Sequence, residues 1–348
     1  MKHLSTIKRT RSSESGLSLV ELLAAFCIFS VVMIAALSAY TSLSRRSATE
    51  YRLAESGVET EIAKNIIERD IMMAGYGLAD DYGDLPLSPL PVEAEEDNTG
   101  VTLLLRGTAM GILSRSAQGW SYIGDTSPLT FQQWADAREN ISSGDRVIYV
   151  DPTSREILTA DSRAVFKYPQ MPSSAGMGTL VYGLHSDNAA LPYYSVEYSL
   201  GGTPPAVCAP GTLNLLRAES KDNDPPVPAN RKPIMNCVVD FQVALGLDTD
   251  GDGLIDLWDP AQRGVFESGK YDIKTLRKRI KQVRVYILVQ NGNFDPDFTY
   301  SNPDDEAAPD TVCVGDPWLE TGRHVQLTPE QRKYRWRVVS ISVTPRNL

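Results

Sequence analysis

One apolar run near the N-terminus limits what this chain can fold into more than any other feature. The 27 residues from 17 to 43, within "SGLSLVELLAAFCIFSVVMIAALSAYTSL", contain a single charged side chain, Glu21. A helix rises 1.5 Å per residue, so this run is ~40 Å long, and the hydrocarbon core of a bilayer is ~30 Å thick. The run therefore predicts one transmembrane helix over residues 17–43.

Glu21, the fifth residue of the run, is the feature that needs an explanation. A carboxylate inside hydrocarbon costs on the order of a few kcal/mol, so such a residue is expected to have a functional partner. The same helix offers no cation as that partner. The alternative is a carboxylate that is simply protonated near the lipid headgroups, since Glu21 is close to the start of the run.

The flanking charges predict an orientation. Residues 1–16 carry four basic side chains and one acid, a net charge of +3. Because the whole chain has a formal net charge of −10, the remaining residues carry a net charge of −13. Basic residues before a transmembrane helix stay in the cytoplasm, so the bulk of the chain is expected across the membrane. A secretory signal has a shorter apolar region followed by a small-x-small cleavage site, which this segment lacks. The acidic body also argues against a general nucleic-acid surface, and no sequence-specific nucleic-acid binding is expected.

The helical pattern continues beyond the membrane segment. Apolar residues recur every three or four positions in two sets, Val58, Ile62 and Ile66, and Ala63, Ile67, Ile71 and Ala74. This spacing predicts an amphipathic helix that ends near Gly75 and Gly77, where glycine can reverse the chain. We therefore expect residues 44–79 to continue the first helix and to pack one face on a globular domain.

Residues 80–348 are typical of a β-rich domain. An irregular connector is expected over 79–100, followed by strands with alternating apolar residues and no strand-helix-strand rhythm, which favours antiparallel pairing. Long polar loops are expected over 201–211, 219–233 and 291–333, and a short helix or turn over the basic segment 274–284. The expected strands are 101–105, 146–150, 156–160, 179–184, 193–200, 212–218, 237–245, 280–290 and 334–345. The predicted fold class is α+β.

An acidic segment, "DTDGDGLIDLWD" over 248–259, matches the twelve-residue calcium-loop template. Its acids fall at alternating positions with Gly253 at the sharp turn, and calcium binds six to eight oxygen ligands. The expected ligands are Asp248, Asp250, Asp252, the backbone carbonyl of Leu254, Asp256 and Asp259. An aspartate replaces the usual glutamate at the last position. The alternative is a solvated acidic turn with local hydrogen bonds. The sequence predicts a structural Ca²⁺ site.

No pattern indicates an enzyme. The segment "GVFESGKY", 264–271, nearly matches a phosphate-binding loop, but Tyr271 replaces the Ser or Thr and no buried strand precedes it. The single histidines His185 and His324 lack a neighbouring ligand or nucleophile. The sequence therefore predicts no catalytic residues.

Four cysteines fit a chain exported to an oxidising compartment. Cys27 is inside the apolar run, which leaves three cysteines and at most one bridge within the chain. Sequence proximity favours Cys208 with Cys237 and leaves Cys313 as a thiol, although spacing alone does not determine connectivity.

These residues together resemble a known family. A basic leader ending in Gly16, followed by an apolar helix with Glu21 as its fifth residue, resembles the class III signal of type IV pilins and type II secretion pseudopilins. Leu17 stands where the family most often has Phe. Four further segments resemble the PilW group of minor pilins in the same order, whereas 101–235 matches only loosely. They are "ERDIMMAGYG", "VVDFQVALGLDTDGDGLIDLWD", "LRKRIKQVRVYILVQ" and "RVVSISVTPRNL".

The resemblance implies a fold and a course of processing. It implies the type IV pilin fold, with a 1–16 leader that prepilin peptidase removes between Gly16 and Leu17, and N-methylation of Leu17. Residues 17–43 would form the transmembrane and filament-core helix, 44–79 its continuation, and 80–348 a periplasmic domain. Glu21 would pair with the amino terminus of a neighbouring subunit.

The expected function is that of a minor pilin at the tip or initiation point of a type IV pilus, supporting adhesion, motility or DNA uptake. Its partners would be other minor pilins, the major pilin, prepilin peptidase and the inner-membrane assembly machinery. It would be a single-pass inner-membrane protein before assembly and part of the cell-surface pilus after it. The alternatives are a GspJ-like type II secretion pseudopilin and a pilus-borne adhesin.

Overall fold

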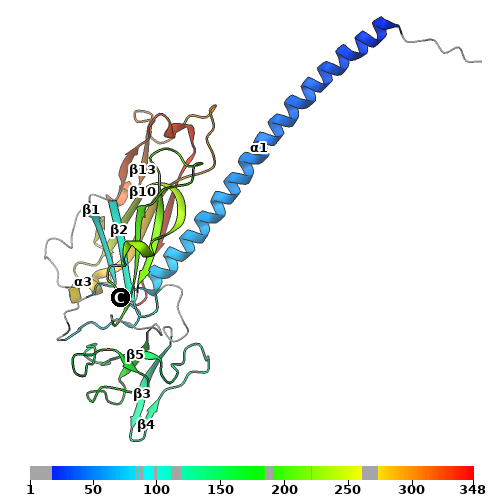
Figure 1. Cartoon of the computed structure of the whole chain (residues 1–348). Coiled ribbons are helices and arrows are strands. Elements are labelled where there is room, and N and C mark those ends of the chain that lie inside the picture. The colour runs from blue at the N-terminus through cyan, green and yellow to red at the C-terminus, as the bar shows by residue number, and fades with distance from the viewer. Residues whose placement is uncertain are drawn as a thin grey trace, which may run out of the picture. The chain divides into compact units, whose positions relative to one another are not determined.

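The computed structural model describes residues 18–83, 85, 89–97, 100–110, 119–184, 191–220, 222–260 and 273–348. In this part of the chain one long helix, α1 (Leu19–Met73), precedes a β-rich region that also contains a short helix, α3 (Ile273–Arg279) (Figure 1). The chain divides into two units, Met1–Arg52 and Leu53–Leu348, which we describe separately. The fold class is α+β, as the sequence predicts.

The N-terminal part of α1 is apolar on all sides. The segment Leu19–Ser44 has 26 residues with a mean hydropathy of 2.6, and its side chains are exposed in the isolated chain. It is long and apolar enough to cross a membrane, which agrees with the predicted span.

The larger sheet belongs to the second unit. Eight described strands form it in the order β1-β2-β8-β9-β10-β12-β15, with β11 paired to β10, and every neighbouring pair is antiparallel. Its strands are β1 (Val92–Asp97), β2 (Gly100–Gly107), β8 (Tyr194–Gly201), β9 (Leu213–Ser220), β10 (Lys232–Leu247), β11 (Leu257–Pro260), β12 (Ile280–Gln290) and β15 (Trp336–Val343). The antiparallel pairing that the sequence favours is confirmed.

Two smaller antiparallel sheets accompany it. A five-stranded sheet, in the order β4-β3-β7-β5-β6, lies between β2 and β8 in the sequence, and a hairpin of β13 and β14 follows β12. The strands are β3 (Trp120–Thr126), β4 (Leu129–Phe131), β5 (Arg146–Val150), β6 (Phe166–Lys167), β7 (Leu180–Gly183), β13 (Thr311–Val314) and β14 (Arg323–Gln326). Single 3-10 turns occupy Pro228–Asn230, Pro317–Leu319 and Gln331–Lys333.

Three local expectations about the strands are wrong. Residues 156–160 form only isolated bridges, because Ile157 and Ala160 each pair with one residue. The expected connector 79–100 contains β1, and the expected loop 291–333 contains the β13–β14 hairpin. The segment "VEAEED" is rich in acids, so its sequence does not indicate a strand. In the structure Val92 and Ala94 are buried in the core, while Glu95 and Glu96 are exposed. Pairing with β2 makes this segment a strand, and local propensity does not reveal it.

The second half of α1 covers the main core with one face. Ala63, Ile67, Ile71 and Ala74 are fully buried in a cluster with residues from β1, β2, β8, β9, β10, β12 and β15. The other apolar set behaves differently, since Val58 and Ile62 are exposed. The predicted packing face therefore consists of the second set, and Val58 and Ile62 are not part of it. Their spacing fits a helix, but at about 100° per residue they fall on another face of it.

A buried polar network joins α1 to the sheet. Asp70 is 1 % exposed, and its Oδ2 accepts hydrogen bonds from the Tyr198 hydroxyl at 2.6 Å and from Arg217 Nε at 2.8 Å. Nη1 of Arg217 also reaches Glu219 at 2.8 Å. Burial, with the Asp70 carboxylate beside it, raises the pKa of Tyr198 well above its usual range. The tyrosine therefore stays a donor, and the network connects α1, β8 and β9.

A second buried cation, Arg277, binds backbone carbonyls just beyond the end of α1. Helix α1 ends at Met73, and Gly75 and Gly77 follow in the left-handed region with φ of 83° and 69°, as the sequence predicts. A Cβ on Gly75 would lie 2.5 Å from the Asn347 carbonyl oxygen. Arg277 donates to the carbonyls of Leu78 and Ala79 at 3.1 and 2.7 Å, which satisfies groups beyond the helix end.

The Asp70 network yields a stability prediction. In Asp70→Asn the buried Arg217 loses its buried carboxylate partner and keeps only the more exposed Glu219, and breaking a buried ion pair costs roughly 3–5 kcal/mol. We expect chemical denaturation of the full chain in detergent to show a loss of this size. The control is Glu68→Gln, whose carboxylate is partly exposed and 3.8 Å from Lys64, and which should change stability by less than about 1 kcal/mol. Equal effects of the two substitutions would contradict the role of Asp70.

Candidate functional site

The start of α1 gives Glu21 a partner in its own turn. Ser18 precedes the first helical residue, and its carbonyl accepts the N–H of Leu22 at 3.1 Å. Its hydroxyl accepts the N–H of Val20 at 3.2 Å, while Glu21 Oε2 accepts the N–H of Ser18 at 2.9 Å. This reciprocal arrangement is a capping box, in which two side chains satisfy N–H groups that the helix leaves open.

The capping box changes the interpretation of Glu21. The apolar run contains no cation that could pair with Glu21, but a backbone N–H serves as its partner, and the positive end of the helix dipole favours a carboxylate there. The pattern Ser-x-x-Glu before an apolar run is the signal that sequence reasoning missed. Gly16 and Leu17, the expected cleavage and methylation positions, lie outside the described residues.

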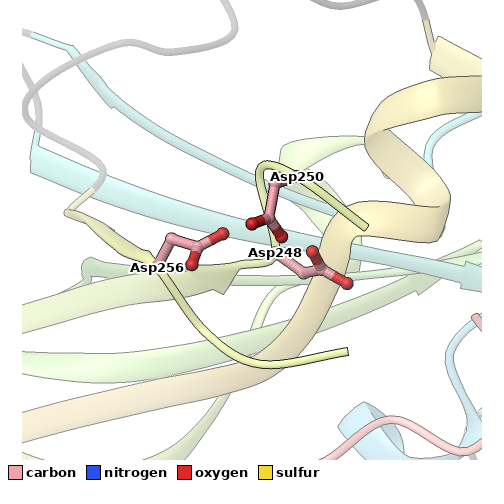
Figure 2. A group of neighbouring side chains, drawn as sticks. All are labelled: Asp248, Asp250 and Asp256. Atoms are coloured by element: carbon pink, nitrogen blue, oxygen red, sulfur yellow. The ribbon is translucent and has the colours of Figure 1, made fainter. Parts of the chain in front are cut away.

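The acidic loop between β10 and β11 brings three of its expected ligands together (Figure 2). One carboxylate oxygen each from Asp248, Asp250 and Asp256 lies within 4.8 Å of the other two. Asp248 is buried at the end of β10, whereas Asp250 and Asp256 are exposed. The group is thus open to solvent on one side and fixed to the sheet on the other.

Two of the expected carboxylate ligands, Asp252 and Asp259, are not part of this group. Asp252 accepts the N–H of Leu254 at 2.8 Å, and the Leu254 side chain is exposed. Asp259 is a buried residue of β11, paired in register with Leu245 of β10. The sheet resumes at Leu257, so Asp259, the last position of the loop template, is part of a strand.

Internal hydrogen bonds hold the three carboxylates. Asp248 accepts the N–H groups of Gly251 and Gly253 at 2.6 and 3.0 Å, and Asp256 accepts the N–H and hydroxyl of Thr249 at 2.7 and 3.0 Å. Burial opposes the charge on Asp248, but these N–H groups and Lys281 outweigh it and keep its pKa below the usual range. Asp248 is therefore an anion at neutral pH.

Two cations that sequence reasoning missed also contact the loop. Lys281 Nζ is 3.4 Å from Asp248 Oδ2, and the guanidinium of Arg279 donates to the Thr249 carbonyl. Both residues belong to the basic segment 274–284, which covers all but the first residue of α3 and the start of β12. Each carboxylate oxygen has lone pairs left for a ligand, so the group can take a hard cation completed by water. Lys281 would compete with that cation for Asp248.

The cysteines and histidines form no reactive group in the described structure. Cys208 and Cys237 form a disulfide with an S–S distance of 2.00 Å, while Cys27 and Cys313 are free. Cys313 is the cross-strand neighbour of His324, but burial raises the pKa of the Cys313 thiol, which makes it a poor nucleophile. His185 and the segment 264–271 lie outside the described residues.

The acidic loop yields a metal prediction. If Ca²⁺ binds the three carboxylates, a chelator should lower the melting temperature of the full chain by about 2–4 °C, because an ion that binds only the folded state stabilises it. Asp250→Ala should abolish this difference. Asp252→Ala is the matched control and should keep it, since Asp252 is outside the group. Identical melting in calcium and chelator would show that the loop works without metal, held by Lys281 and its own hydrogen bonds.

The chain matches no protein-family model, no curated protein and no solved structure. The function is therefore argued from the sequence pattern and from the geometry of these sites.

Proposed function

We propose that this chain is a minor pilin, similar to the PilW group, that helps to initiate a type IV pilus and occupies its tip. It has the pilin fold, with α1 as its anchor and the β-rich unit in the periplasm. Prepilin peptidase cuts between Gly16 and Leu17, and Leu17 becomes methylated. Its partners are other minor pilins, the major pilin and the inner-membrane assembly machinery.

One observation carries this proposal. Helix α1 has 55 residues, its first 26 are apolar and exposed, and the only charge among these 26 is Glu21 in the first turn. The capping of α1 accounts for a side-chain acceptor at this place, but lipid offers no cation to a full negative charge there. A helix that later packs among other helices can use it, since each neighbour can supply a charged group.

Glu21 would change partners on assembly. In the isolated chain its carboxylate accepts the N–H of Ser18, which lowers the cost of keeping it near the membrane. In the filament it would pair with the amino terminus of Leu17 in a neighbouring subunit. A buried ion pair adds little net stability, but either charge left alone is costly, so the pair fixes the register of the subunits.

The size of the second unit supports a tip role. It combines an eight-stranded sheet with a separate five-stranded sheet and a further hairpin. Such bulk would crowd neighbours in the repeating shaft, whereas a tip position leaves it free on one side. The long segments between β8 and β10 and between β12 and β15 are the surfaces that a tip protein would offer to its surroundings.

Two substitutions of Glu21 separate its two roles. Glu21→Gln keeps an oxygen that can accept the Ser18 N–H but removes the charge, while Glu21→Ala removes both. If the charge fixes register, both variants should be cleaved normally and both should enter pili poorly, by about tenfold or more. Immunoblots of whole membranes and of sheared pili measure cleavage and incorporation.

Other results would reject parts of the proposal. If Glu21→Gln is incorporated like the unmodified chain and only Glu21→Ala fails, capping of α1 is the role of Glu21 and the intersubunit ion pair is wrong. If a strain lacking the gene has normal pilus number, motility, adhesion and DNA uptake, the minor-pilin function itself is wrong.

A further inference from the structure

The strand β15 pairs with another strand on one side only. It is the last strand of the main sheet, and β12 pairs with it over all eight of its residues. The ladder continues for one more pair, since the Asn291 N–H donates to the Arg335 carbonyl at 2.7 Å. Residues that bond to the neighbouring strand alternate with residues that point away from it in an antiparallel pair. The backbone groups of Val338, Ser340 and Ser342 therefore point away from β12.

These outward backbone groups form an open edge. In the part of the chain that the structure describes, no hydrogen bond reaches the backbone of Val338, Ser340 or Ser342. The side chains of Ser340 and Ser342 are exposed, and that of Val338 is partly buried, so water reaches this edge. A row of unpaired N–H and C=O groups is a template for one more strand.

Other edge strands of the protein are protected, whereas β15 is not. At the opposite end of the main sheet, β1 has four acids among its six residues. The edge strands β4 and β6 of the five-stranded sheet have only three and two residues. Charges and short strands are the usual means by which proteins prevent pairing between molecules. In contrast, β15 has eight residues, and its segment "VVSISV", 338–343, contains no charge and no proline.

The two faces of β15 specify the side chains that an added strand needs. Val339, Ile341 and Val343 are buried in the core that β15 shares with α1. A strand beside them would extend this core with aliphatic side chains. Ser340 and Ser342 are exposed on the opposite face, which suits small or polar side chains. The complement of this edge is therefore an uncharged segment in which aliphatic and small polar residues alternate.

The direction of α1 argues against a second copy of this chain as the added strand. Ser56 of α1 donates to the side chain of Asn291, which is bonded to Arg335 just before β15. Asn347, just after β15, donates to the Met72 carbonyl at 3.1 Å. Residues 56–72 of α1 thus run in the same direction as β15. Two copies paired antiparallel through β15 would turn these helices in opposite directions, which two anchors in the same membrane do not allow.

A parallel pair of two copies does not match either. In a parallel ladder, each residue that bonds lies opposite a residue whose backbone groups point away. Two identical strands at equal register place Ser340 opposite Ser340, so they cannot form this ladder with the closed symmetry that is usual for dimers.

We propose that β15 accepts an extended segment of a different protein as a further strand of the main sheet, and that this segment alternates aliphatic and small polar residues without charge. Backbone hydrogen bonds to Val338, Ser340 and Ser342 provide the affinity, and contacts with Val339 and Ile341 select the side chains. The exclusion of a second copy rests on the proposed function, in which α1 is a membrane anchor. The open edge itself does not depend on pilus assembly.

Site-specific photo-cross-linking of the full chain in its native membranes tests this edge. A benzophenone amino acid replaces the exposed Ser342 in one variant and Leu129, on the short edge strand β4, in the control. We expect the probe at Ser342, and not at Leu129, to give an adduct with one other protein. Peptide mapping should place the adduct in an uncharged segment of alternating aliphatic residues.

A proline at the neighbouring outward position tests whether backbone pairing holds the partner. Ser340→Pro removes an outward N–H but leaves the bonds to β12, and edge strands tolerate such a proline. Added to the Ser342 probe, it should lower the adduct yield about tenfold or more. Ser340→Ala is the matched control, because it keeps the N–H and should leave the yield unchanged.

A reciprocal pair of substitutions guards against misfolding. The Cys208–Cys237 disulfide, seen as a mobility shift on reduction, verifies the folding of each variant. If Ser340→Pro does not form it, the probe moves to Ser340, and Ser342→Pro is compared with Ser342→Ala. The remaining outcomes overturn the proposal. They are no adduct, adducts with lipid only, a dimer of this chain only, the same adducts at Leu129, attachment to a helix or a charged segment, or equal yields with proline and alanine.

The test separates this edge from the pilin function, because cross-linking is measured in membranes and needs no filament. A proline-sensitive adduct, together with normal pilus number, motility, adhesion and DNA uptake in a strain lacking the gene, would keep the edge and reject the function. Absence of the adduct together with poor incorporation of Glu21→Gln would do the reverse.

Discussion

The second unit depends on a buried contact between Asp70 of α1 and Arg217 of β9. Asp70 lies on the helix face that buries the aliphatic residues Ala63, Ile67 and Ile71, and Tyr198 donates to the same carboxylate oxygen as Arg217. Apolar packing of Ala63, Ile67 and Ile71 alone would let α1 slide along the sheet with little change in buried area. A charged pair has one position in which both partners are satisfied. The network therefore fixes where α1 lies, and Arg277 fixes where it ends.

That fixed position decides which residues α1 leaves outside. Because Ile67 and Ile71 face the sheet, Val58 and Ile62 point to solvent, and Ile66 and Arg69 border a cavity beside β10. At the other end of the helix, Glu21 is held by the N–H of Ser18. Two interactions thus decide what α1 presents to its surroundings. The capping box holds Glu21 at the start of the helix, and the long-range ion pair of Asp70 with Arg217 sets which residues near its end are exposed.

Much of the fold follows from the sequence, and the misses have physical causes. The long helix, its end at Gly75 and Gly77 and the main antiparallel strands show in the spacing of apolar residues. The strand β1 does not show in this spacing, because four of its six residues are acidic. Its two apolar side chains, Val92 and Ala94, become buried only when β1 pairs with β2. The acidic loop shows in the sequence, but its last acid, Asp259, belongs to β11, and Lys281 reaches Asp248 from a strand 33 residues further along the chain.

The sequence by itself determined an apolar N-terminal helix with one carboxylate, an amphipathic continuation, an antiparallel β-rich body and an acidic loop. These are properties of neighbouring residues, and periodicity and composition reveal them. Only the tertiary structure decided which apolar row of α1 is buried, which three aspartates of the loop converge, and which cations approach them. Those outcomes depend on contacts between residues far apart in the chain, such as Asp70 with Arg217, whose partners no local pattern specifies.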